Sequence, residues 1–226
     1  MVEVLVDGGI ARIFLNRPQK VNALSFELLD ALAKSFQGLD VHVAVLAGHG
    51  RVFSAGADIH EMSKTTVEKI HAACRAIRDA PFPVVAAMHG VVVGGALEIA
   101  ASCDLRVAAE GTTFAMPEVK LGIPSVVEAA LLPRLIGAGR ARWLVLTGEA
   151  IDARRALEWG LIDEVGPETN LLKILLTADR EALRVQKRLC QLWEEAPLPV
   201  SVAQSIERFG EVIARRALSA GKPSAP

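Results

Sequence analysis

The stretch Pro83-Val-Val-Ala-Ala-Met-His-Gly-Val-Val-Val-Gly-Gly-Ala-Leu-Glu98 contains the transition that decides the fold. Its first part, Pro83 to Met88, is a short, continuous apolar run, which is typical of a strand buried on both faces of a parallel sheet. Gly94 and Gly95 interrupt that pattern, and the residues from Gly95 to Ser102 are typical of a helix that begins at the glycines. The stretch therefore predicts a strand closely followed by a helix.

The same alternation of strand and helix extends over the first 110 residues. Val2 to Leu15 is predicted to be a hairpin, because Asp7-Gly8-Gly9 separates two β-rich runs. A helix is expected after Ser25, and further elements are expected at residues 41–46 (strand), 67–78 (helix) and 105–108 (strand). Such alternation indicates parallel βαβ units and an α/β fold class. After Val126 helices are predicted at 126–135, 140–146, 152–159, 171–194 and 200–218, and only 162–165 is expected to be extended.

Composition and charge limit the possible partners and compartment. The 226 residues are 51% apolar and 23% charged, with a net charge of −1, which favours one large domain with an appendage. We expect no nucleic acid and no membrane partner, because the net charge supplies no attracting field and no apolar run approaches the roughly 18 residues of a membrane span. Met1 leads directly into a strand pattern rather than a signal peptide. Three widely spaced cysteines without a CxxC motif are typical of small buried thiols, so a cytoplasmic protein is predicted.

Two short stretches carry the functional signal. Phe53-Ser-Ala-Gly-Ala-Asp-Ile59 and Gly94-Gly-Ala-Leu-Glu98 place small residues where a backbone N–H can approach a ligand, and Met116-Pro-Glu118 adds a second carboxylate to that of Glu98. Backbone donors aimed at a developing oxyanion, with acids beside them, suit chemistry next to a thioester carbonyl. No carboxylate or histidine spacing suggests a metal site, and none is expected.

An ordered set of motifs marks a resemblance to a known family. The motifs are Asn16-Arg17-Pro18-x-Lys20-x-Asn22-Ala23-Leu24, Ala55-Gly56-Ala57-Asp58-Ile59, Gly90-x3-Gly94-Gly95-x2-Glu98, Cys103-Asp104, Phe114-x2-Pro117-Glu118-x2-Leu121-Gly122-Ile123-Pro124, and Leu146-Thr147-Gly148 leading to Ala156-x2-Trp159-Gly160-Leu161-Ile162. In this order the chain resembles the crotonase superfamily, the enoyl-CoA hydratase/isomerase group. Each motif alone is weak, but the ordered set is specific.

The resemblance implies a fold, a ligand and an assembly. It implies a crotonase-like spiral of ββα turns over residues 1–165 and a helical C-terminal region over 166–220 that serves trimerisation and active-site cover in shortened form. The composition of residues 221–226 separately predicts a disordered tail. The resemblance further implies a homotrimer or a dimer of trimers and an acyl-CoA substrate of fatty acid metabolism. No separate cofactor is expected, since coenzyme A is part of the substrate.

The resemblance also assigns roles to residues. It implies that the thioester oxygen lies between the N–H groups of Ala57 and Gly95, while Glu98 deprotonates water and Glu118 delivers a proton to C2 of a 2-enoyl thioester. The residues implied in substrate binding are Lys20, Val21, Ala23, Ala55, Asp58, Ile59, His60 and Gly94. Because isomerases and decarboxylases of the superfamily usually lack one of the two acids, their joint presence favours hydration.

Other interpretations stay open at this point. The glycine pair can be a packing turn, Glu98 a helix-terminal acid, Glu118 an exposed loop acid and Asp58 a capping residue. Glu128, where many family hydratases have a glycine-rich stretch, can lie on a helix surface or point into the acyl pocket. The rival functions are an enoyl-CoA isomerase and a non-catalytic acyl-CoA-binding or RNA-binding relative. The RNA-binding alternative rests on the basic cluster around Arg184.

Overall fold

The computed structural model describes residues 1–220 and forms two compact units, Met1–Leu176 and a helical unit that begins at Thr177. The boundary predicted after residue 165 between the spiral core and the helical C-terminal region remains a prediction, since this division into compact units does not test it. The tail predicted at 221–226 lies outside the described residues.

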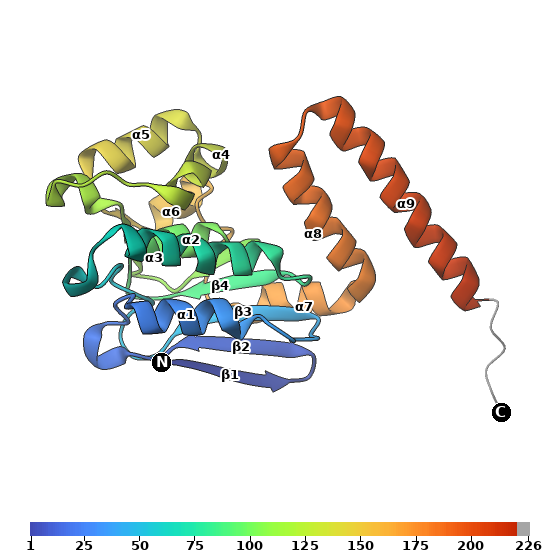
Figure 1. Cartoon of the computed structure of the whole chain (residues 1–226), viewed down its shortest axis with the longest axis horizontal. Helices are drawn as coiled ribbons and strands as arrows, with labels where there is room; N and C mark the ends of the chain where they lie inside the picture. The colour runs from blue at the N-terminus through green and yellow to red at the C-terminus, as the bar shows by residue number, and fades with distance from the viewer. Residues whose placement is uncertain (221–226) are drawn as a thin grey trace. The chain divides into compact units, whose positions relative to one another are not determined.

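A six-stranded sheet is the framework of the first unit (Figure 1). Its strands follow the order β1–β2–β3–β4–β6–β9, and only the β1–β2 pair is antiparallel. The predicted hairpin and the parallel βαβ units are therefore confirmed. The bounds of the strands are β1 Val2–Asp7, β2 Ile10–Leu15, β3 Val43–Gly48, β4 Val84–Met88, β6 Leu105–Ala108 and β9 Glu164–Val165.

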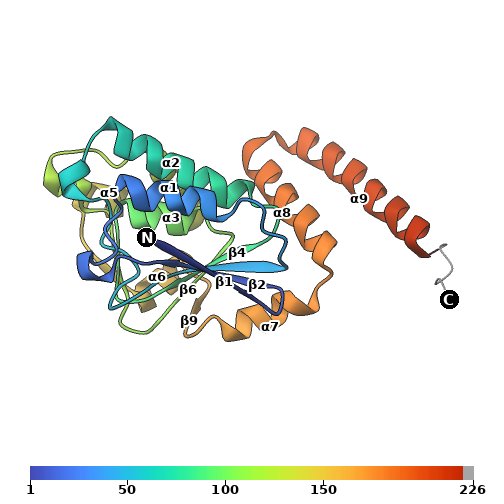
Figure 2. The ribbon, with the colours of Figure 1, turned by 60° about the horizontal axis from the view of Figure 1, so that its bottom comes forward.

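Three helices cover one face of this sheet: α1 (Phe26–Ser35), α2 (Lys64–Asp79) and α3 (Gly95–Ala101) (Figure 2). Ser25 starts α1 by accepting the Leu28 N–H, and Ser63 starts α2 through a capping box. The main core fills the space between the helices and the sheet. On the opposite face, Leu172 of α7 (Thr169–Thr177) packs against valines of β3, β4 and β6. Strands β3 and β4 are thus buried on both faces, as their unbroken apolar sequence predicts.

A second, three-stranded sheet, absent from the sequence-based prediction, carries the chain towards the glycine pair. It consists of β5 (Val91–Val93), β7 (Thr113–Ala115) and β8 (Ile151–Asp152). Strands of two or three residues have too few positions for a periodicity to be read. Gly90 separates β5 from β4 with a φ of +66°, and a side chain there would overlap the Arg51 carbonyl oxygen. This turn sends β5 directly into Gly94.

The remaining helices largely follow the expected pattern. They are the 3₁₀ turns η1 (Pro18–Lys20), η2 (Ile59–Glu61), η3 (Pro117–Leu121) and η4 (Val127–Leu131), and the α-helices α4 (Leu132–Ile136), α5 (Ala138–Thr147), α6 (Ala153–Trp159), α8 (Arg180–Glu195) and α9 (Leu198–Ala220). The single helix predicted at 171–194 is wrong, because Asp179 accepts the Ala182 N–H and starts α8 as a new helix. Within the second unit, α8 and α9 pack against each other, and Arg215 forms an ion pair with Glu181.

Two further findings bear on the predictions from composition. Cys74 and Cys103 are buried, but Cys190 is exposed, so the prediction of a buried thiol is wrong for Cys190. Among residues 1–220, no helix combines the length and the apolar character that crossing a membrane requires.

Candidate active site

Two chain segments run side by side at the predicted oxyanion site. Ser54 forms a parallel bridge with Val92, donates its N–H to the Val91 carbonyl at 3.2 Å and accepts the Val93 N–H at 3.3 Å. Ala57 and Gly95 each lie three residues beyond this bridge, on the two segments that it joins. Close contact persists at least to Gly56, where a Cβ would lie 2.6 Å from the Val93 carbonyl oxygen.

The amides of Ala57 and Gly95 are unused donors. Gly95 is the first residue of α3, and the first N–H groups of a helix have no acceptor within it. Leu97 and Glu98 both donate to the Gly94 carbonyl. Across the part of the chain that the structure describes, neither the Ala57 N–H nor the Gly95 N–H has a hydrogen-bond acceptor. Two free donors on adjacent segments are what a developing oxyanion requires.

Glu98 lies on α3 in an almost fully buried position, with 4% of its surface exposed. Burial, followed by the negative charges of Glu118 and Glu128, raises the pKa of Glu98 to about 8. Hydrogen bonds from the backbone of Ala129 and Val126 offset part of this effect. A carboxyl group that keeps its proton near neutral pH is suited to acid/base chemistry.

Glu118 is brought to the same place by η3. It is half-buried, so the exposed-loop alternative is wrong. Its Oε1 lies so close to Gly94 that a Cβ there would be 2.5 Å away, and its Oε2 accepts the Ser125 hydroxyl at 3.0 Å. Gly94 also has a φ of +56°, which a residue with a side chain adopts only with strain. A side chain at position 94 would therefore strain the turn and displace the Glu118 carboxylate.

Glu128 is a third carboxylate in this cluster. It lies on η4 with 7% of its surface exposed, so its placement on a helix surface is wrong. Its Oε1 is 2.7 Å from Nδ1 of His71, a residue of α2. Neither His71 nor Ser125 was predicted as a site residue. His71 contacts Glu128 across 57 residues of sequence, and Ser125 contacts Glu118 across 7. No local sequence motif indicates either contact.

The segments predicted to line the substrate path also come together. Ala55 donates its N–H to the Val21 carbonyl at 3.1 Å, and Leu24 donates to the Gly56 carbonyl at 2.9 Å. Asn22, between them, is fully buried, and its Nδ2 is 2.8 to 3.0 Å from the carbonyl oxygens of His49, Val52 and Phe53. The stretch from Lys20 to Ala23 thus adjoins the stretch from Ala55 to Ala57, and Asn22 fixes the loop.

Asp58 has a structural role. Its carboxylate forms a 2.6 Å ion pair with Arg17 and accepts the His60 N–H at 3.1 Å, which confirms the capping interpretation. The hydrogen bond from Arg17 is the main cause that lowers the pKa of Asp58. Lys20, Ile59 and His60 are exposed at the edge of the site. Contacts of these four residues with substrate stay predictions.

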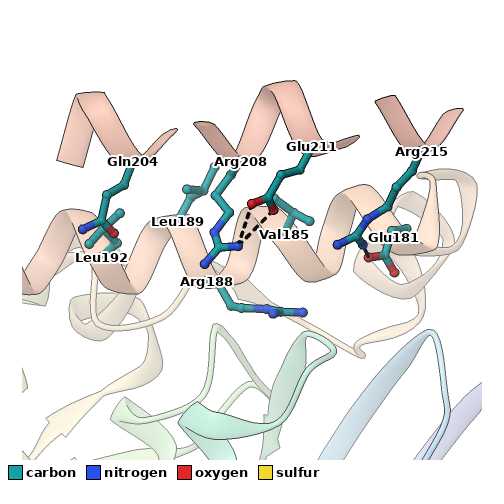
Figure 3. Close-up of a pocket in the computed structure, with 9 residues that line it drawn as sticks. All are labelled: Glu181, Val185, Arg188, Leu189, Leu192, Gln204, Arg208, Glu211 and Arg215. Carbon is teal, nitrogen blue, oxygen red and sulfur yellow. Dashed lines mark hydrogen bonds and ion pairs between the residues drawn. The ribbon is translucent and has the colours of Figure 1, made fainter. Parts of the chain in front are cut away.

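The helical unit contains a pocket of its own, between α8 and α9 (Figure 3). It is lined by Glu181, Val185, Arg188, Leu189, Leu192, Gln204, Arg208, Glu211 and Arg215. None of the predicted site residues is among them. Lys187, a member of the basic cluster that favours RNA binding, is buried. In residues 1–220 no group of three or more His, Cys, Asp or Glu side chains is arranged to hold a metal ion.

The architecture and the site together define a class of protein. A parallel sheet with one antiparallel edge, a small second sheet that leads into a glycine turn, and acids gathered at that turn are the features of a crotonase-like fold. Comparison with family models agrees: residues 6–202 match the enoyl-CoA hydratase/isomerase model, and the chain belongs to this family.

Individual relatives support the same assignment. The chain is 33% identical over 196 residues to enoyl-CoA hydratase domain-containing protein 3, mitochondrial, of Danio rerio, covering 81% of this chain and 65% of that protein. The chain thus spans slightly less than two thirds of that relative's length. The crystal structure of enoyl-CoA hydratase from Thermoplasma volcanium superposes with a TM-score of 0.88 at 31% identity, covering 98% and 97% of the two chains. A candidate enoyl-CoA hydratase from Thermobifida fusca in complex with CoA matches with a TM-score of 0.86 at 26% identity, covering 96% and 94%.

Proposed function

We propose that the protein is a 2-enoyl-CoA hydratase, which adds water across the double bond of an α,β-unsaturated acyl-CoA thioester. The observation that carries the proposal is the meeting of Glu98 and Glu118 at the Gly94–Gly95 turn, beside two free backbone donors. An acyl-CoA substrate is further supported by the CoA complex of the Thermobifida fusca relative.

The backbone donors stabilise the charge that hydration creates. Addition of hydroxide at C3 moves electrons through the conjugated double bond and builds enolate charge on the thioester oxygen. The N–H groups of Ala57 and Gly95 hold that oxygen in our proposal. Each such donor is worth roughly 3–4 kcal/mol of barrier in enzymes that use backbone or amide donors in this way.

The two acids handle the protons of the added water. Glu98 orients the water and accepts one proton as the C3–O bond forms, and Glu118 gives its proton to C2 as the enolate collapses. The pair must therefore hold one proton in total before reaction, and it must lie on Glu118 when water attacks. The raised pKa of Glu98 supports this proposal, because it supplies a protonated carboxyl beside Glu118 near neutral pH, and that proton passes to Glu118 before water attacks.

Replacement of Glu118 by Gln tests the assignment. We expect turnover of crotonyl-CoA to fall at least about 100-fold, since Gln cannot donate the proton, while acyl-CoA affinity stays near normal. Turnover is measured by loss of enoyl thioester absorbance, and affinity by calorimetry with a non-reactive acyl-CoA. Unchanged turnover would remove Glu118 from the mechanism.

The second candidate is an enoyl-CoA isomerase of the same family. The observation in its favour is Glu128, whose burial beside the two acids gives the pocket a third carboxylate. Product analysis separates the reactions: a hydratase forms a 3-hydroxyacyl thioester from crotonyl-CoA, whereas an isomerase converts a 3-enoyl thioester into its 2-enoyl isomer. A homotrimeric or hexameric assembly, the lack of a separate cofactor, a cytoplasmic location and a role in fatty acid metabolism remain part of the proposal.

A further inference from the structure

Glu128 is a buried acid that the proposed reaction does not use. The residue is 7% exposed, and within residues 1–220 its Oε2 is buried without a geometric hydrogen-bond partner. A carboxylate in such a position is costly unless another group holds it. His71 is one partner of its carboxylate, with Nδ1 at 2.7 Å from Oε1, and the Cys74 thiol is a second, weaker one.

The backbone around Glu128 favours a specific placement of the side chain. Val127, the residue before it, has a φ of +41°, a left-handed conformation that is strained for a β-branched residue. Strain of this kind persists when surrounding contacts over-determine the conformation. Here η4 packs against both α2 and α3, the helices that carry His71 and Glu98. Glu128 therefore lies between a half-exposed histidine and the acid/base site.

The charged and titratable groups around Glu128 come from three elements. Glu98 of α3 and both His71 and Cys74 of α2 interact with Glu128, and Glu118 of η3 interacts with Glu98. Burial raises the pKa of the Cys74 thiol, so this group faces Glu128 in neutral form. The Glu128 charge acts on Glu98 and is one cause of the raised pKa of Glu98.

We propose that His71 and Glu128 form a positioning pair for the acid/base site: His71 holds Glu128 in place, and the negative charge of Glu128 favours the retention of one proton by the neighbouring pair of Glu98 and Glu118. Neither residue touches substrate in this role. The inference deepens the proposed hydration, because it names the group that sets the pH range over which Glu98 and Glu118 share a proton.

The test measures titration of Glu98 itself, by ¹³C NMR of protein labelled at the glutamate carboxyl carbons. The Glu98 signal is assigned by its loss in Glu98→Gln. In Glu128→Gln the buried negative charge is gone, so we expect the Glu98 midpoint to fall by roughly one pH unit. Glu68→Gln, which neutralises an exposed acid on α2, serves as the matched control and should leave the midpoint unchanged.

Substitutions of His71 keep the test valid if Glu128→Gln folds poorly, since His71 is half-exposed. His71→Leu removes the 2.7 Å partner of Glu128, so the buried carboxylate is no longer held beside Glu98 and the Glu98 midpoint falls as well. His71→Asn retains a donor near the place of Nδ1 and should restore the wild-type midpoint. The double variant of His71→Leu and Glu128→Gln should shift no further than Glu128→Gln alone.

The outcomes separate this inference from the proposed function. A Glu98 midpoint in Glu128→Gln or His71→Leu that equals the wild-type value overturns the positioning pair, whatever the enzyme's activity. If the midpoints shift but the wild-type protein does not hydrate crotonyl-CoA, the pair stands and the hydratase proposal fails. If hydration is present and the pair is correct, the pH profile of kcat shifts in the same direction as the NMR midpoint.

Discussion

Glu98→Gln should make the protein more stable, and the gain should grow as pH rises. The folded protein holds a proton on Glu98 up to a pKa of about 8, whereas the model value for an ordinary glutamate is 4.5. Between these values the folded state binds a proton that the unfolded state has lost. The stability of the wild-type protein therefore falls with rising pH in this window, and that of a Gln variant has no such contribution.

The size of the effect follows from the width of the window. Each pH unit between the two pKa values changes the free energy of unfolding by about 1.4 kcal/mol. Between pH 5.5 and pH 7.5 the stability of Glu98→Gln relative to wild type should thus rise by about 2–3 kcal/mol. Below the pKa of the unfolded state the difference becomes constant, because Glu98 is then protonated in both states.

Urea denaturation at four pH values between 5 and 8 measures this slope. The difference between variant and wild type at each pH cancels the titration of all groups that the two proteins share. Glu68→Gln again serves as the control, because its side chain is 57% exposed and should give a flat difference. A pH-independent difference for Glu98→Gln would show that Glu98 is ionised in the folded protein, contrary to the burial argument.

Two further substitutions probe the turn and the loop of the site. Gly94→Ala should lower the free energy of unfolding by about 1–3 kcal/mol and displace Glu118, so that kcat also falls. The control is Gly111→Ala, because Gly111 also has a positive φ, of +80°, but its Cβ would have no atom within 4 Å, so this variant should retain kcat. Equal activities of the two variants would contradict the clash between a side chain at position 94 and Glu118. Asp58→Ala should lower the free energy of unfolding measured by urea denaturation by about 2–3 kcal/mol. The substitution removes the side chain that caps the His60 N–H and leaves Arg17 without its 2.6 Å partner. Asp79→Ala, which breaks an exposed pair with Arg75, should cost less than about 0.5 kcal/mol, and a similar loss for both would refute the structural role of Asp58.

Sequence reasoning was most reliable where the pattern is local. The run that forms β4 is apolar throughout, the short run that forms β6 is apolar except for Arg106, and Ser25 marks the start of α1, so these elements were predicted nearly to the residue. The short strands β5, β7 and β8 were not predicted, because two or three residues are too few to show a periodicity and their pairing joins residues far apart in the sequence. The break between α7 and α8 depends on a single capping residue, Asp179, inside a continuous helical pattern.

The candidate site shows the same division. The glycines and acids of the ordered motifs were identified from the sequence, and the structure places Glu98 and Glu118 at one turn. Their partners were not identified, because His71 and Ser125 act through contacts that follow no fixed spacing. The pKa of Glu98 likewise depends on which carboxylates are buried beside it, and only the folded chain determines that arrangement.

Asn22 has a consequence for the chemical ageing of the protein. Its amide group is a donor that faces three carbonyl oxygens, while its Oδ1 accepts the Arg17 N–H. Deamidation would convert this side chain into an aspartate, and a carboxylate would then face three acceptors that it cannot satisfy. Replacement of this one nitrogen atom by oxygen would loosen the loop from Lys20 to Ala23, which lies beside residues 55–57. The acids and the proposed oxyanion donors would themselves be unaltered.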